Sequence, residues 1–122
     1  MDFLEKFNDL FREMIQDLIN VFPKDSELRM YKLGIEAYLF ADKNAISRVF
    51  YKEFYVPYSE KIKNEDESFF LEKDYQEYGK YQNVGDIISK LKKCWLELND
   101  ENKQAIWKYF KVLSILSERV EA

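Results

Sequence analysis

Carboxylates are the most numerous ionisable side chains of this sequence, with 23 Asp and Glu residues against 19 Lys and Arg. Five of them recur at intervals of three or four near the start of the chain: Asp2, Glu5, Asp9, Glu13 and Asp17. Paired carboxylates can act as general acid and base in a hydrolase, but this spacing selects no particular pair. It favours a solvated helix face whose like charges repel one another. The alternative is a docking strip for a basic partner or for lysines nearer the C-terminus.

Other catalytic side chains are scarce. The chain has no His, which removes the commonest general base, the imidazole metal ligand and the Ser-His and Cys-His nucleophile pairs. Gly34, Gly79 and Gly85 are isolated, so the sequence has no glycine-rich phosphate loop. Cys94 is the single cysteine and lies one turn after Leu91 on an apolar face, which indicates a buried thiol. We therefore expect no enzyme, no cofactor, no metal site and no small-molecule substrate.

Lysines near the C-terminus suggest a second kind of chemistry. Lys90, Lys92 and Lys93 form a basic cluster that Lys108 and Lys111 can extend across a bundle. Such a surface could contact phosphates, and a nucleic-acid-associated accessory protein is the alternative function. The formal net charge of −4 argues against it, because nonspecific nucleic-acid binding needs many cations that neutralise phosphates. We expect ordinary solvated helix surface here, and no nucleic-acid partner.

An aromatic segment, NEDESFFLEKDYQEYGKYQ at 64–82, carries the main functional candidates. Two readings remain open: the segment is a lid over the core, or part of it stays exposed as a protein-binding surface. Tyrosine suits interfaces because its rigid ring buries area while its hydroxyl still finds a partner. We expect Phe69 or Phe70 to anchor the segment and the tyrosines to face a protein partner or a second copy of the chain. The candidate partner-binding residues are Tyr58, Phe69, Phe70, Tyr75, Tyr78 and Tyr81.

Helical periodicity dominates the elements that must position these residues. Apolar residues recur at intervals of three and four over five stretches, at 3–22, 28–39, 46–54, 86–98 and 101–119. Pro23 ends the first helix, and Asp25 or Ser26 is the expected cap of the second. Asp42 is the expected cap of the third. The sequence predicts an all-α fold.

The middle of the chain has a weaker pattern. The residue before Pro57 is disfavoured in a helix, so the third helix should end or kink near Val56. Residues 57–83 show no sustained period, and we expect a less regular segment there. Within it, a short helix from about Glu67 to Tyr78 is plausible, with Asp66 as its cap.

The last helix, capped by Asn99 or Asp100, is apolar on nearly every side. A helix of that kind is normally the centre of a bundle. We therefore predict a single domain over 1–122, a compact bundle of five to six helices with the C-terminal helix at its centre. Emptying an aromatic site there, at Trp107 or Phe110, should cost about 3–5 kcal/mol of stability.

Cellular context follows from composition. A single Cys suits a reducing compartment, and no signal pattern or apolar run near the ~18 residues of a membrane span is seen. We expect an intracellular protein without a membrane partner. The sequence is also rich in Phe, Tyr, Ile, Asn and Lys and poor in Gly, Ala, Arg and Pro, a skew typical of an AT-rich genome.

Three segments carry a family resemblance: FPKDSELRMYKLGI, VPYSEKIKNEDESFFLEKDY and LKKCWLELNDENKQAIWKYFKVLSILSERV. They resemble segments of small uncharacterised helical proteins of nucleocytoplasmic large DNA viruses, the giant viruses. The resemblance implies an infected host cell, with the protein in the cytoplasm, a viral factory or the virion. It implies no activity and no functional residues. We expect a non-enzymatic interaction or structural module that binds protein through its aromatic 51–81 region.

Overall fold

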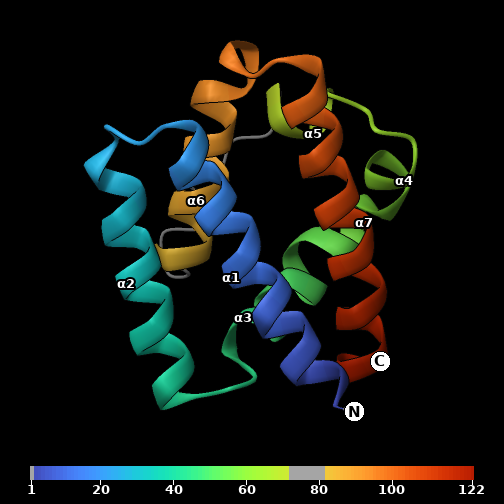
Figure 1. Cartoon of the computed structure of the whole chain (residues 1–122). Coiled ribbons are helices and arrows are strands. Elements are labelled where there is room, and N and C mark those ends of the chain that lie inside the picture. The colour runs from blue at the N-terminus through green and yellow to red at the C-terminus, as the bar shows by residue number, and fades with distance from the viewer. Residues whose placement is uncertain (1, 72–81) are drawn as a thin grey trace.

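The computed structural model describes residues 2–71 and 82–122, with the backbone alone for 82–86. Every regular element in this part of the chain is helical (Figure 1). In chain order the elements are α1 (Phe3–Val21), α2 (Ser26–Ala41), α3 (Ala45–Phe50), a π-helical turn η1 (Tyr51–Tyr55), α4 (Val56–Lys63), α5 (Ser68–Leu71), α6 (Gln82–Cys94), a 3-10 turn η3 (Trp95–Glu97) and α7 (Asp100–Glu121). The all-α prediction is confirmed.

The C-terminal helix α7 is the central element of the bundle, as predicted. It packs on α1, α3, η1 and α4, and α1 in turn packs on α2 (Figure 1). Ile106, Trp107, Phe110 and Leu113 of α7 face the core. The opposite side of α7 is open to solvent, and Ile115 on that side is more than half exposed.

Side-chain caps explain where three of the helices begin. Asp2 accepts a hydrogen bond from the Leu4 amide at 2.9 Å, and Asp25 accepts one from the Glu27 amide at 3.0 Å. Asn99 does the same for Asn102 at 2.8 Å. Such caps satisfy amides that have no partner inside the helix.

The prediction that Asp42 caps the third helix is wrong. The carboxylate of Asp42 accepts from the Asn44 amide at 3.0 Å and closes a turn instead. Asn44 is the residue that precedes α3, and it makes no side-chain cap. Asp25 and Asp42 each accept from the amide two residues on, but α2 begins directly after Asp25, whereas α3 begins only three residues after Asp42.

The kink predicted near Val56 is found at Tyr58, but Val56 itself stays helical, with φ −57° and ψ −51°, contrary to the effect expected of Pro57 on the residue before it. Pro57 has no amide hydrogen, and its ring would clash with the carbonyl one turn earlier in a regular helix. The Val56 amide instead donates to the carbonyl of Tyr51, five residues back, which widens the turn before the proline. Tyr58 then leaves helical geometry with a φ of −129°. Helix continues to Lys63 after this kink.

The segment 57–83 is more regular than predicted, since α4 fills its start and α6 begins at Gln82. The short helix expected from Glu67 appears as α5, and Asp66, two residues before its start, accepts from the Ser68 amide at 3.0 Å in the turn that leads into it. The rest of that expected helix, up to Tyr78, lies outside the described residues.

A chain of aromatic rings connects the helices through the core. Phe7 of α1 contacts Phe50 of α3, with ring centroids 5.7 Å apart, and Phe50 contacts Phe110 of α7 at 5.7 Å. Phe110 contacts Phe70 of α5 at 5.3 Å, and Phe70 stacks on Trp95 of η3 at 4.4 Å. These rings hold α1, α3, α5 and η3 on the central helix.

Candidate interaction surface

Phe69 and Phe70, predicted as partner-binding candidates, are buried in the core. Both side chains are essentially inaccessible, and their rings lie 5.0 Å apart between Phe110 and the tryptophans. Phe70 also approaches Trp107, with centroids 5.0 Å apart. The anchoring role expected for this pair is confirmed, but neither ring reaches a surface that a partner could touch.

The tyrosine candidates divide into described and undescribed positions. Tyr58 is half-buried against Phe69, with ring centroids 5.6 Å apart, so its ring belongs mainly to the core. Tyr51 and Tyr55 stack on each other at 5.7 Å, and the hydroxyl of Tyr55 donates to Glu118 of α7. That hydrogen bond raises the pKa of Tyr55. The predictions for Tyr75, Tyr78 and Tyr81 concern positions outside the described residues.

The lysine surface of the alternative function is interrupted by acids of the same chain. Lys90 lies 2.9 Å from Asp25 and 3.0 Å from Glu27, and only 14% of its side chain is exposed. Lys111 pairs with Glu65. Half-buried Lys92 also has an interaction of its own, while Lys93 and Lys108 are exposed. The ends of the predicted basic strip are therefore already neutralised.

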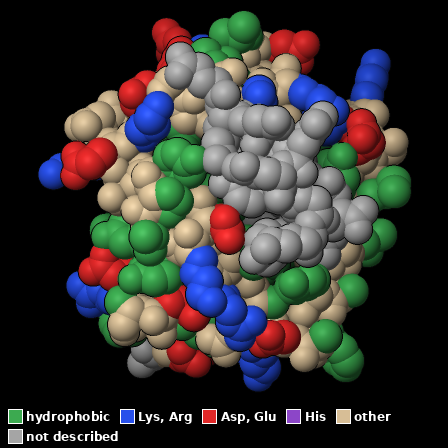
Figure 2. Space-filling view, turned by 180° about the vertical axis from the view of Figure 1, so that it is seen from behind, with side chains coloured by type: hydrophobic (Ala, Val, Ile, Leu, Met, Phe, Trp, Pro, Cys, Tyr) green, Lys and Arg blue, Asp and Glu red, His purple; other side chains and the backbone are tan. Residues whose placement is uncertain are grey.

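Helix α2 carries three large apolar side chains that are strongly exposed along its outer side. Phe40 is 96% exposed, Leu33 72% and Met30 66%, and the small residue Ala37 is exposed between them. The spacing of three, four and three places all four on one stripe of a helix. We call these four residues the α2 outer face. Helix α2 forms one edge of the molecule (Figure 1), and hydrophobic side chains gather along that edge in the view from behind (Figure 2).

The sequence analysis missed this surface because α2 is apolar on two opposite sides. Leu28, Ile35 and Leu39 face the core and are buried. A helix with a polar outer side would have carried charged residues at positions 33 and 40. The sequence feature that could have revealed this surface is a second set of apolar residues in 30–40, which lies about half a turn around the helix from the buried set.

Charged residues bordering the α2 outer face are satisfied within the chain. Glu36 accepts from Arg12 of α1 at 2.7 Å, and Lys32 donates to Gln16 of α1 at 2.6 Å. Arg29 donates to the backbone carbonyl of Pro23. The polar groups along this flank of the apolar stripe therefore already have partners.

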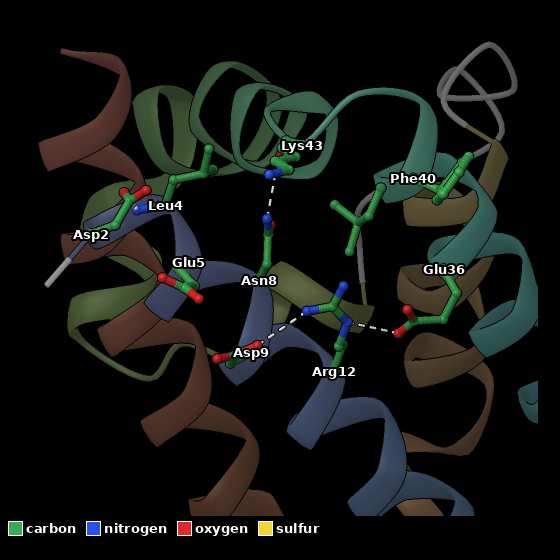
Figure 3. Close-up of a pocket in the computed structure, with 10 residues that line it drawn as sticks. Asp2, Leu4, Glu5, Asn8, Asp9, Arg12, Glu36, Phe40 and Lys43 are labelled. Atoms are coloured by element: carbon green, nitrogen blue, oxygen red, sulfur yellow. Dashed lines mark hydrogen bonds and ion pairs between the residues drawn. The ribbon is translucent and has the colours of Figure 1, made fainter.

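A groove between α1 and α2 adjoins one end of this face. Its volume is about 510 Å³, and its lining residues are Asp2, Leu4, Glu5, Asn8, Asp9, Arg12, Glu36, Leu39, Phe40 and Lys43. Arg12 lies between Asp9 and Glu36, and Asn8 donates to the backbone carbonyl of Lys43 at 3.1 Å (Figure 3). The groove is thus polar on the α1 side and apolar at Phe40.

The acidic residues of α1 serve mainly as a structural, solvated face. Asp2 caps the helix, Asp9 pairs with Arg12 at 3.1 Å, and Asp17 accepts from the hydroxyl of Tyr109 on α7. Burial, together with that carboxylate, raises the pKa of Tyr109. These three carboxylates are held by a cap, an arginine or a phenol, so no acid–base pair stands out among them.

The described residues offer no other obvious chemistry. Burial raises the pKa of the Cys94 thiol to about 11, so it is protonated and unreactive at neutral pH. Among the residues whose positions are described, no group of three or more His, Cys, Asp or Glu could hold a metal ion. None of the helices in this part of the chain has the length and apolar character needed to cross a membrane.

The remaining information about identity comes from comparison with known proteins. No protein-family model, no curated protein and no solved structure gives a significant match to this chain.

Proposed function

We propose that this protein is a non-enzymatic protein-interaction module and that it binds through the α2 outer face. One observation carries the proposal: Met30, Leu33 and Phe40 lie on one side of a well-packed helix, and their exposed fractions are 66%, 72% and 96%. Exposed apolar patches are uncommon on monomers and usually mark contacts. The helix beneath them is held by its buried side, so the stripe is presented rigidly.

The chemistry of this stripe suits a helix or a groove on another protein surface. Large apolar side chains at spacings of three and four are the anchors of helix-mediated recognition. Phe40 is the strongest single anchor, because a nearly fully exposed ring loses the most water on binding. The satisfied polar groups along one side of the stripe form part of the polar rim that such contacts usually have.

The proposed contact surface, the α2 outer face, differs from the aromatic 51–81 region that was expected from the sequence. Burial of Phe69 and Phe70 supports a structural role for 64–71. A second contact through Tyr75, Tyr78 and Tyr81 stays a prediction. The ion pairs of Lys90 and Lys111 leave fewer cations for phosphates, so we do not propose nucleic-acid binding.

The proposed setting is the cytoplasm, the viral factory or the virion of a giant virus in its host cell. This proposal depends on the resemblance of the three sequence segments and on the AT-rich composition alone. It implies that the partner is a protein of the virus or of the infected cell.

Capture of partners by matched variants tests the function. The chain would be tagged and purified from the cells that naturally produce it, as wild type, as a Leu33→Glu, Phe40→Glu double variant, and as a Leu96→Glu control. Leu96 is 75% exposed on η3, away from α2, so the control also places an acid at an exposed apolar position, but elsewhere on the surface. Circular dichroism confirms that each variant is folded.

We expect the double variant to lose proteins that the wild type and the Leu96→Glu control retain, including an untagged copy of the chain if that is the partner. If the double variant is folded and retains every captured protein at wild-type level, the α2 outer face is not a binding surface.

A further inference from the structure

We infer that the α2 outer face binds a second copy of the same chain, with the two α2 helices antiparallel about a two-fold axis near residue 35. This inference rests on the proposed function and specifies its partner.

The stripe is symmetric about its own centre. Positions 30 and 40 are equidistant from residue 35, and so are positions 33 and 37. An antiparallel copy therefore places Met30 opposite Phe40 and Leu33 opposite Ala37, and the two-fold axis repeats both pairs. Each contact is thus made twice, as an isologous interface requires.

The centre of the stripe allows the two helices to approach closely. Ala37 faces outward, and Gly34 lies at the border of the stripe. Helices that meet at small residues pack at the short end of the usual range of about 8–10 Å between axes. Leu33 of each copy then fills the space above Ala37 of the other, while Met30 and Phe40 close the two ends.

Charge on α2 does not oppose the pairing. Its charged residues are two acids and two bases, Glu27, Arg29, Lys32 and Glu36. Glu36 is the charged residue nearest the proposed axis, and Arg12 neutralises it at 2.7 Å in each copy. The chain as a whole carries a formal charge of −4, so two copies repel at long range. Salt screens that repulsion, and the dimer should become stronger as salt is added.

The available area sets the strength of the dimer. A helix of 16 residues is about 24 Å long and about 10 Å wide with its side chains. Each face therefore covers roughly 240 Å², and two faces bury a total on the order of 500 Å², well below the standard interface of about 1,600 Å² and at the weak, transient end of the range. We therefore expect a dissociation constant on the order of 10–100 µM, a dimer that forms at high local concentration.

Sedimentation equilibrium of the purified chain tests the inference. Samples would run from about 5 µM to 500 µM, a range that brackets the expected constant, in low and high sodium chloride. Wild type is compared with Leu33→Glu, with Phe40→Ser and with the control Leu96→Glu. Leu33 and Phe40 are exposed in the single chain, so neither change should disturb folding, and a thermal melt checks this.

We expect a monomer–dimer equilibrium for wild type and Leu96→Glu that strengthens with salt. Leu33→Glu and Phe40→Ser should each weaken it by at least about tenfold, since the first places a charge at the centre of the contact and the second removes the ring that closes each end. A wild-type chain that is monomeric at every concentration overturns the inference, as does a dimer unaffected by both α2 variants. If the purified chain is monomeric but the double variant still loses a captured protein, the proposed function survives with a different partner.

Discussion

Replacing Phe70 with Ala is the sharpest test of whether the aromatic segment at 64–71 is part of the core. Phe70 is fully buried, and four aromatic rings surround it with centroids between 4.4 Å and 5.3 Å away: Phe69, Trp95, Trp107 and Phe110. Truncation of a buried Phe costs about 3–5 kcal/mol, and packed ring pairs add to the transfer of area. We expect a loss near the upper end, about 4–5 kcal/mol.

Urea denaturation measures this loss. With an m-value of about 1.5 kcal/mol/M, the midpoint should fall by about 3 M. The two tryptophans of the chain both contact Phe70, so their fluorescence and the helical signal at 222 nm provide two independent probes. Coincidence of the two transitions checks that unfolding is two-state.

Phe40→Ala is the matched control, because it removes the same side chain from a 96% exposed site. Its stability should change by less than about 0.5 kcal/mol. A Phe70→Ala loss below about 1 kcal/mol would refute the reasoning, because the ring would then belong to a detachable lid and not to the core.

Two further predictions concern charge and backbone strain. Hydrogen bonds from Lys90 lower the pKa of Asp25 and of Glu27, so their contribution is present above the usual carboxyl pKa of about 4 and is lost as pH falls below it. Lys90→Met should therefore flatten the loss of melting temperature between pH 5 and about 2, and the exposed control Lys93→Met should not. Glu65 has a φ of 53°, which favours glycine. Glu65→Gly should be more stable than Glu65→Ala by about 1 kcal/mol in urea melts, and equal stability would show that this turn is unstrained.

Helical periodicity was sufficient to predict the fold class, because each helix buries one continuous apolar stripe. Asn99 and Asp25 were predictable as caps, since each precedes the first apolar residues of a helix. The continuation of helix past Pro57 was not predictable from local pattern. It depends on the π-helical turn at 51–55, which packs on α7.

The candidate surface was harder to predict than the fold. An aromatic cluster near acids, such as Phe69 and Phe70, has the same composition whether it is exposed or buried. Only the packing of α5 against Trp95 and Phe110 places both rings in the core. In α2, apolar residues that could have been assigned to the core are exposed instead. The buried stripe of Leu28, Ile35 and Leu39 is already sufficient to predict an amphipathic helix, so the second apolar stripe is not needed for that prediction.

The most direct measurement of the proposed contact is photo-cross-linking from position 33. Benzoylphenylalanine would replace Leu33 in one sample and Leu96 in another, and cross-linked peptides would be identified by mass spectrometry from the cells that produce the protein. We predict an intermolecular adduct from position 33, with its acceptor in the 30–40 stretch of a second copy, and none above background from position 96. Adducts from both positions at equal, low yield, or from position 33 only within a single chain, would contradict the assignment of the α2 outer face as an interface.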